Sequence, residues 1–209
     1  MKSKAAVKRV LAALDRLYPW DGRCFLHYQT PWQLLFATIL SAQCTDERVN
    51  QVTPVLFAAF PTLEAFAQAN LLELEEAVRP TGFFHVKAQN LQRAAQQLLE
   101  RHNGQLPSDM EALTALPGVG RKTANVVRGH IFGLPSVTVD THVKRVAYRL
   151  GLTSHTDPVK IEFELMGILP KKHWIRINQQ LITHGRHICK ARRPLCGECT
   201  LPDCERHDL

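Results

Sequence analysis

The sequence contains no long hydrophobic run. None of its apolar stretches approaches the roughly 18 residues that a membrane-spanning helix needs, which argues against a membrane protein. The first residues, MKSKAAVKRVLAALDRL, also lack the uninterrupted apolar core and the small-residue cleavage site of a secretory signal. We therefore expect a reducing compartment, in which clustered cysteines bind metal rather than pair as disulfides.

Strand-forming segments and internal repeats are equally scarce. Only residues 136–139, SVTV, look extended, and one segment is too short and isolated to form a sheet. Elsewhere apolar residues recur at the spacing of one helix face. An all-α fold is therefore predicted, and 209 residues are enough for one domain or two small ones.

Local start and stop signals divide the chain into helices. Thr30-Pro31 is typical of an N-cap followed by a proline in the first helical position, and it opens a helix that continues to Leu40. Ser108 and Glu111 have the spacing of a capping box, which predicts a short helix ending at Leu116. Other helices are expected over residues 7–17, after an N-cap at Asp46, from Thr62, over 85–102 with Asn103-Gly104 as the stop signal, from Asp157 to near Pro170, and over 174–184.

Acidic residues are nearly absent from one stretch of the chain. Between Leu116 and Gly151 there are six Lys or Arg residues and a single acid, Asp140, whereas residues 62–80 have the opposite balance. The whole chain carries a formal charge of +7. This distribution predicts one face that binds a polyanion and another that stays solvated.

Residues 113–127, LTALPGVGRKTANVV, join two helical segments through a very tight turn. Gly118 and Gly120 permit positive φ and leave the backbone bare, and the N–H groups that follow open a helix that suits a phosphate oxygen. A simple turn between helices is the alternative. Arg121, Lys122 and Arg128 favour contacts with a nucleic-acid backbone, which position a protein without reading bases.

Two residues near this turn are candidates for chemistry. Lys122 falls in the first turn of its helix, where a cation opposes the helix dipole, so the position is unfavourable unless a function requires it. It could contact phosphate or act as a nucleophilic amine. Asp140 would repel a polyanion, which a catalytic role would justify, although its position also fits an N-cap.

Four cysteines lie within the last twenty-one residues, with the spacing C-x6-C-x2-C-x4-C. Loops so short cost little entropy to close around a metal centre. Zinc and an iron–sulfur cluster both remain possible from the spacing, because zinc sites usually offer two C-x2-C pairs and this chain has one. The four are Cys189, Cys196, Cys199 and Cys204, and the gap after the first contains Lys190, Arg192 and Arg193.

Several motifs occur together and in one order: LSAQCTD at 40–46, LPGVGRKTANVV, VDTHVKRVAYRLG, HGR at 184–186, and the cysteines. The chain resembles the helix-hairpin-helix DNA glycosylases from about residue 5 to Cys204, and among them the branch that also acts as a lyase. This resemblance implies a base excision repair enzyme that removes oxidised pyrimidines of the thymine glycol type from double-stranded DNA. It then cleaves the abasic site by β-elimination. A monomer without membrane contact, in the bacterial cytoplasm at the nucleoid, is also implied.

The resemblance further implies two helical domains flanking a DNA-binding cleft. Residues 22–133 would form a six-helix domain with the helix-hairpin-helix at about 113–127. Residues 1–21 and 134–209 would form a discontinuous iron–sulfur domain.

Individual roles follow from the same resemblance. Lys122 matches the Schiff-base lysine, Asp140 the neighbouring catalytic aspartate, and the four cysteines the ligands of a [4Fe–4S] cluster. Phe83 stands where many relatives have leucine, and four residues rather than five separate the last two cysteines. The implied DNA contacts are Gln43, which would fill the gap left by a flipped nucleotide, Phe83 as an intercalating wedge, and Gly118, Gly120, Arg121, Lys190, Arg192 and Arg193 on the backbone.

Three other functions are weighed against this one. An adenine-removing relative would carry a glutamate in residues 34–44, where this chain has no acid. A relative acting on thymine or uracil in mismatches would replace Lys122 with tyrosine or serine. A non-catalytic iron–sulfur DNA-binding module would need neither Lys122 nor Asp140. The remaining cysteines, Cys24 and Cys44, are expected to be buried and inert.

Overall fold

A computed structural model describes residues 2–205 of the chain. Over this range the structure is all α-helical, with short 3-10 helices and no strand, which confirms the predicted fold class. The backbone divides into two compact units. We call Cys24–Leu134 the central unit, and Met1–Arg23 together with Pro135–Leu209 the terminal unit.

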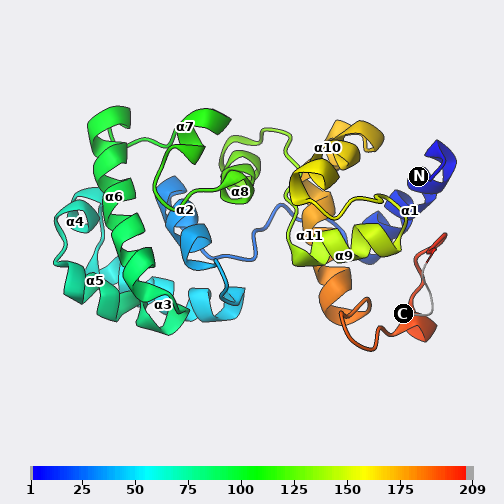
Figure 1. The fold of residues 1–209 in the computed structure, drawn as a ribbon, viewed down its shortest axis with the longest axis horizontal. Helices are drawn as coiled ribbons and strands as arrows, with labels where there is room; N and C mark the ends of the chain where they lie inside the picture. The colour runs from blue at the N-terminus through cyan, green and yellow to red at the C-terminus, as the bar shows by residue number, and fades with distance from the viewer. Residues whose placement is uncertain (1, 206–209) are drawn as a thin grey trace. The chain divides into compact units, whose positions relative to one another are not determined.

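The central unit is built around one hydrophobic core. Figure 1 shows its longest helix, α6, running beside α4 and α5. Trp32, Phe36, Phe57 and Phe66 pack edge to face, with ring centroids 4.8 to 6.3 Å apart, the geometry that aromatic rings prefer. Its helices are α2 (Pro31–Leu40), α3 (Asp46–Ala59), α4 (Leu63–Gln68), α5 (Leu71–Val78), the 3-10 helix η1 (Arg79–Thr81), α6 (Phe84–His102), α7 (Met110–Thr114) and α8 (Arg121–Phe132).

Several helix ends lie where the sequence places them. Thr30 is the N-cap of α2, and its N–H donates to the side chain of Gln33 at 3.1 Å. α6 ends before Asn103, which has a left-handed φ of 51°, and the N–H of Gly104 returns to the carbonyl of Leu98 at 2.9 Å. The helix-period pattern and the cap residues therefore predict these elements well.

Two predicted caps are wrong by one residue. α7 begins at Met110, so its N-cap is Asp109 rather than Ser108, and the Asp109 carboxylate accepts from the N–H of Ala112 at 2.9 Å. A cap oxygen has to reach the N–H three residues further on, and Asp109 meets that requirement. α3 is likewise capped by Thr45, with Asp46 in its first turn. α7 also ends at Thr114, before the expected Leu116.

The terminal unit brings the N-terminal helix together with the last third of the chain. Within it, Gln180 donates to the Asp15 carboxylate at 2.9 Å and to the Tyr18 carbonyl at 3.1 Å, which fastens α1 to α11. Its elements are α1 (Lys4–Leu17), α9 (Thr141–Arg149), α10 (Pro158–Ile168), the 3-10 helix η2 (Lys171–His173), α11 (Trp174–His187) and the 3-10 helix η3 (Cys196–Glu198).

α9 and α11 pack closely because Gly185 has no side chain. A Cβ at Gly185 would lie 2.9 Å from the Arg145 guanidinium and 3.1 Å from His142 Nδ1. The carbonyl of Gly185 also accepts from Arg145 at 3.0 Å. The glycine of the HGR motif therefore lets an arginine of α9 reach the backbone of α11.

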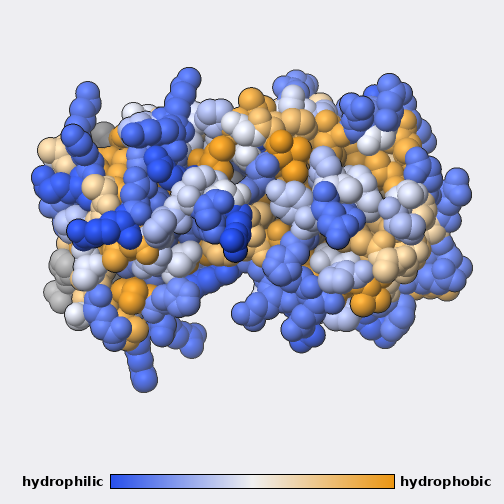
Figure 2. All heavy atoms as spheres, turned by 180° about the vertical axis from the view of Figure 1, so that it is seen from behind, coloured by the Kyte–Doolittle hydropathy of each residue, from blue (hydrophilic) through white to orange (hydrophobic). Residues whose placement is uncertain are grey.

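Hydrophilic side chains predominate on the face drawn in Figure 2, and hydrophobic ones gather in smaller patches between them. None of the helices in residues 2–205 is both long and apolar enough to cross a membrane. The large hydrophobic side chains that stay exposed among the described residues are Leu17, Val55, Leu72, Phe83, Val86, Val159 and Phe163.

Candidate functional site

The tight turn predicted between two helices lies between α7 and α8. Gly118 has a φ of 76°, and a Cβ there would lie 2.9 Å from the Asn90 side-chain amide of α6. Gly120 is the N-cap of α8 with an ordinary φ of −92°, no side chain caps this helix end, and a Cβ there would meet nothing within 4 Å. Gly118 is thus required by the fold, whereas Gly120 keeps the helix N-terminus uncovered.

The two glycines should therefore respond differently to alanine. Gly118→Ala should lower the free energy of unfolding by about 1–3 kcal/mol, because it forces a left-handed alanine against Asn90. Gly120→Ala, the matched control, should change it by less than about 1 kcal/mol but weaken binding to duplex DNA, because a methyl group then covers the end of α8. Urea unfolding and a DNA-binding titration measure the two effects. Equal loss of stability in both variants would contradict this assignment.

Lys122 is an exposed residue in the first turn of α8. Its neighbours in sequence, Arg121 and Thr123, are half-buried, so Lys122 is the first exposed side chain of α8. A cation at a helix N-terminus opposes the field of the helix, so this position is unfavourable unless a function requires it. An exposed primary amine beside a bare backbone turn can attack an electrophilic carbon of a ligand bound to that turn.

Asp140 is the N-cap of α9 in the terminal unit. Its Oδ1 accepts from the N–H of Val143 at 2.7 Å, and the residue is half-buried. The N-cap role that the sequence also allows for Asp140 is therefore confirmed. A carboxylate whose rotamer is fixed by a cap is also a preorganised negative charge, as electrostatic catalysis requires.

Gln43 and Phe83 are both exposed and both strained. Gln43, in the loop after α2, has a φ of 53°, and Phe83, the N-cap of α6, has a φ of 49°. Left-handed φ is uncommon for residues of these types. Phe83 is 64 % exposed, whereas its neighbour Phe84 packs against the core. Arg79 Cζ lies over the Phe84 ring, 5.1 Å from its centroid. The two adjacent aromatics are thus separated into one core residue and one protruding ring.

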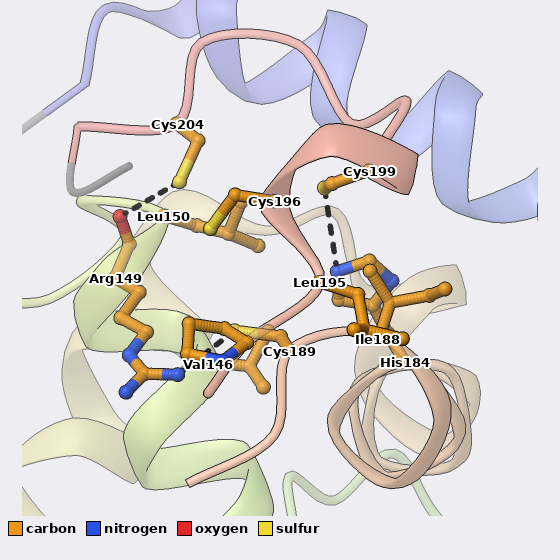
Figure 3. Close-up of a pocket in the computed structure, with 11 residues that line it drawn as sticks. Val146, Arg149, Leu150, His184, Ile188, Cys189, Leu195, Cys196, Cys199 and Cys204 are labelled. Carbon is orange, nitrogen blue, oxygen red and sulfur yellow. Dashed lines mark hydrogen bonds between the residues drawn. The ribbon is translucent and has the colours of Figure 1, made fainter. Parts of the chain in front are cut away.

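The four C-terminal cysteines line a single pocket of the terminal unit (Figure 3). Its remaining walls are Val146, Leu150, Ile188, Pro194 and Leu195, together with Arg149 and His184. No group of three or more Cys, His, Asp or Glu residues within 2–205 has the spacing of a site for a metal ion. Four thiols in one mostly apolar pocket are nevertheless the donor set that an iron–sulfur cluster uses.

Side-chain nitrogens face two of these sulfurs. Arg149 Nη1 donates to Cys189 Sγ at 3.4 Å, and His184 Nε2 lies 3.7 Å from Cys199 Sγ. Burial lowers the pKa of His184 to about 4, so the ring is neutral, and Tyr18 Oη lies 2.9 Å from its Nδ1. Donors directed at ligand sulfurs are typical of iron–sulfur sites.

Arg149 and Arg145 also hold the segment that follows Cys189. Arg149 donates to the carbonyls of Lys190 at 2.6 Å and Ala191 at 3.2 Å, and Arg145 donates to the Cys189 carbonyl at 3.1 Å. In the sequence, both arginines stand out only by their positive charge. The basic residues Lys190, Arg192 and Arg193 all remain exposed on this fastened segment.

The two other cysteines, Cys24 and Cys44, belong to the central unit. Both are half-buried, and burial raises the pKa of the Cys24 thiol to about 11. A thiol with such a pKa stays protonated at neutral pH and is a poor nucleophile, which agrees with the inert role expected for Cys24.

Comparison with known proteins identifies the relatives of this chain. Residues 36–171 match the model of the HhH-GPD superfamily of base excision DNA repair proteins. Endonuclease III of Synechocystis sp. is 54 % identical over 199 residues, which cover 95 % of this chain and 90 % of that protein. Endonuclease III of Haemophilus influenzae is 44 % identical over 181 residues, 86 % of each chain.

A solved structure of a trapped endonuclease III–DNA covalent intermediate, with an estranged adenine, superposes on this fold. Its TM-score is 0.93 at 41 % sequence identity, and the match covers 99 % of this chain and 98 % of that one. Because the superfamily match spans more than half of the chain and these relatives span most of it, the chain belongs to the HhH-GPD superfamily and, within it, to the endonuclease III family of base excision DNA repair enzymes.

Proposed function

We propose that this enzyme removes oxidised pyrimidines of the thymine glycol type from duplex DNA and then cleaves the strand at the abasic site. The observation that carries this is the exposed side chain of Lys122 in the first turn of α8, at an uncapped helix N-terminus, in a member of the endonuclease III family. A relative 41 % identical to this chain has been trapped as a covalent intermediate with DNA. We further propose that the enzyme acts as a monomer in the bacterial cytoplasm, at the nucleoid.

In this reaction the neutral amine of Lys122 attacks C1′ of the damaged nucleotide. The C1′–N bond breaks, the base leaves with its electron pair and takes up a proton, and opening of the sugar leaves an imine between Nζ and C1′. The imine acidifies C2′, whose proton a base removes. β-Elimination then breaks the bond from C3′ to the phosphate oxygen, and water hydrolyses the imine to release the lysine.

Asp140 would stabilise this chemistry by its charge. Positive charge develops on the sugar as the glycosidic bond breaks, and a fixed carboxylate lowers the energy of that state without having to reorganise. The hydrogen bond from Val143 holds Oδ1 in place. The same group can assist proton transfer at the lysine.

DNA would be bound mainly through its phosphates. Backbone N–H groups beyond Gly118 and Gly120, with Arg121, would contact one stretch of backbone, and the segment of Lys190, Arg192 and Arg193 would contact another. The target nucleotide has to leave the stack, at a cost of a few kcal/mol that is lower for damaged bases. Gln43 would fill the vacated space, and the protruding ring of Phe83 would wedge between bases.

The residues present fit a [4Fe–4S] cluster. Cys189, Cys196, Cys199 and Cys204 would hold it, and side-chain nitrogens of Arg149 and His184 would face two of its ligand sulfurs. Bound there, the cluster supplies folding energy to a segment with little regular structure. Its function in this proposal is to fix the basic segment after Cys189 rather than to react.

The direct test uses duplex DNA with a single thymine glycol or a single abasic site. The purified enzyme should release the base, cut the strand, and form a covalent complex with either DNA when borohydride reduces the imine. Base release without any trapped complex would contradict the Schiff-base mechanism.

Charge removal from the segment after Cys189 should weaken binding to every duplex by a similar factor. Replacing Arg192 and Arg193 with alanine should lower affinity for undamaged and damaged DNA about tenfold or more, and reduce the slope of log affinity against log salt by about 2. Lys4 and Lys8, both exposed on α1, provide a control pair with the same loss of charge and should change the slope little. If only damaged-DNA binding falls, the arginines recognise the lesion and not the backbone.

A further inference from the structure

Lys87 is a buried cation that the reaction does not use. It lies in the first turn of α6, where the helix dipole opposes a positive charge, and only 4 % of its surface is exposed. Burial lowers the pKa of its amine. A lysine in such a place has to be stabilised by specific acceptors, because an unpaired buried charge is costly.

The acceptors are backbone carbonyls at the C-terminal ends of two other helices. Lys87 Nζ donates to the carbonyl of Leu40, the last residue of α2, at 2.8 Å and to that of Thr81, the last residue of η1, at 2.7 Å. Carbonyls at the C-terminal end of a helix lack intrahelical partners and attract cations. One ammonium group therefore links the C-terminal ends of two helices, α2 and η1, that are far apart in sequence.

A strained, exposed residue follows each of these carbonyls. Gln43 lies three residues after Leu40, and Phe83 lies two residues after Thr81, both with left-handed φ. Such conformations cost energy and persist where the surroundings hold them. We call residues 41–44 the Gln43 loop and residues 82–83 the Phe83 loop.

We propose that Lys87 is a positioning residue that holds the Gln43 loop and the Phe83 loop in one fixed arrangement, so that both side chains enter the duplex together. The inference rests on the proposed function, in which Gln43 fills the gap and Phe83 is the wedge. Lys87 itself does not touch DNA in this scheme. Its amine is buried and already donates to two carbonyls, which makes it unsuitable as a second nucleophile.

The test separates reactions that need intercalation from those that do not. Lys87→Met keeps the bulk of the side chain but removes the charge and its donors, leaving two carbonyls unpaired. Single-turnover base release from thymine glycol duplex should slow about 10- to 100-fold. Strand cleavage and borohydride trapping on a single-stranded abasic oligonucleotide, which has no stack to open, should change less than about threefold.

A second measurement follows the two loops in the free protein. The N–H of Cys44 donates to the Ser41 carbonyl within the Gln43 loop at 3.1 Å, and the N–H of Gly82 donates to the Arg79 carbonyl of η1 at 3.2 Å. In Lys87→Met, hydrogen exchange should become faster in both loops and stay unchanged in α8. Unchanged exchange in either loop would overturn the inference.

Leu98→Ala is the matched control. Leu98 is fully buried eleven positions further along α6, about 16 Å away, so its truncation destabilises the same unit without touching either loop. It should leave the ratio of duplex to single-strand rates within about twofold of wild type. If Leu98→Ala shifts this ratio as Lys87→Met does, the effect is one of stability and the inference fails.

Lys87→Arg keeps a cation with several donors and should retain duplex base release within about tenfold of wild type, which provides a readout even if Lys87→Met does not fold. If Lys87→Arg lowers the reaction rate on single-stranded DNA as much as on duplex DNA, the inference is also overturned. A wild-type enzyme that neither releases base nor forms a trapped complex would refute the proposed function instead.

Discussion

Lys122→Gln is expected to abolish both base release and the borohydride-trapped complex, with a loss of at least about a thousandfold in the single-turnover rate. The amide cannot form an imine. Duplex affinity should stay close to that of wild type, because in the proposed binding mode affinity comes from phosphate contacts made by other residues. Rates on thymine glycol and abasic duplexes, and a salt-controlled binding titration, give the three measurements.

Asp140→Asn is the partner experiment. Asparagine caps a helix about as well as aspartate, so α9 should keep its N-terminus and the stability of the protein should hardly change. Base release should slow about 10²- to 10⁴-fold, because the charge that stabilises the sugar is gone. Cleavage of ready-made abasic sites should suffer less, since their ring-opened aldehyde needs no oxocarbenium stabilisation.

For the Lys122→Gln prediction, the contradicting outcome is a trapped complex on abasic DNA, which would show that another amine is the lyase.

Replacing Cys196 with alanine should remove the cluster. Wild-type protein should be yellow-brown with broad absorbance at about 400 nm, and the variant should lose both this absorbance and its iron. The segment from Cys189 onward should unfold, because the energy of metal binding is folding energy in such short loops. Absorbance, iron content and limited proteolysis test this.

Cys44→Ala controls for the loss of a thiol, because this cysteine lies in the central unit and outside the pocket. It should retain iron and colour in full. Colourless wild-type protein that folds with one zinc ion per chain would contradict the assignment of the cluster. Full iron content in the Cys196 variant would show that this residue is not a ligand.

The sequence predicts the elements better than the contacts between them. Thr30-Pro31 and Asn103-Gly104 mark helix ends correctly because a cap acts over three or four residues. The predicted Ser108 cap is wrong because the neighbouring Asp109 caps as readily, and only the exact start of the helix decides which of them does. The period of the apolar residues was sufficient for the all-α class.

The candidate site residues could also be predicted from the sequence, but the residues that hold them in position could not. Lys122 and the cysteines stand out by residue type and spacing. Arg149 holds the Lys190 carbonyl 41 positions away, and Lys87 holds the Leu40 carbonyl 47 positions away. The spacing of apolar residues does not predict a contact between two residues so far apart in sequence, and a single sequence contains no other signal for it. The distinction between Phe83 and Phe84 likewise depended on backbone φ, which their identical side chains do not reveal.

The discontinuous terminal unit has a consequence for synthesis on the ribosome. α1 emerges first but packs with α11, and roughly 157 positions separate Leu17 from Trp174. At about 5 to 20 residues per second, α1 waits roughly 8 to 30 s for its partner, while the whole of Cys24–Leu134 leaves the exit tunnel in between. The nascent central unit can therefore fold first, and the amphipathic N-terminal helix, with Val10 and Leu14 still uncovered, is the segment for which a chaperone would have time to compete.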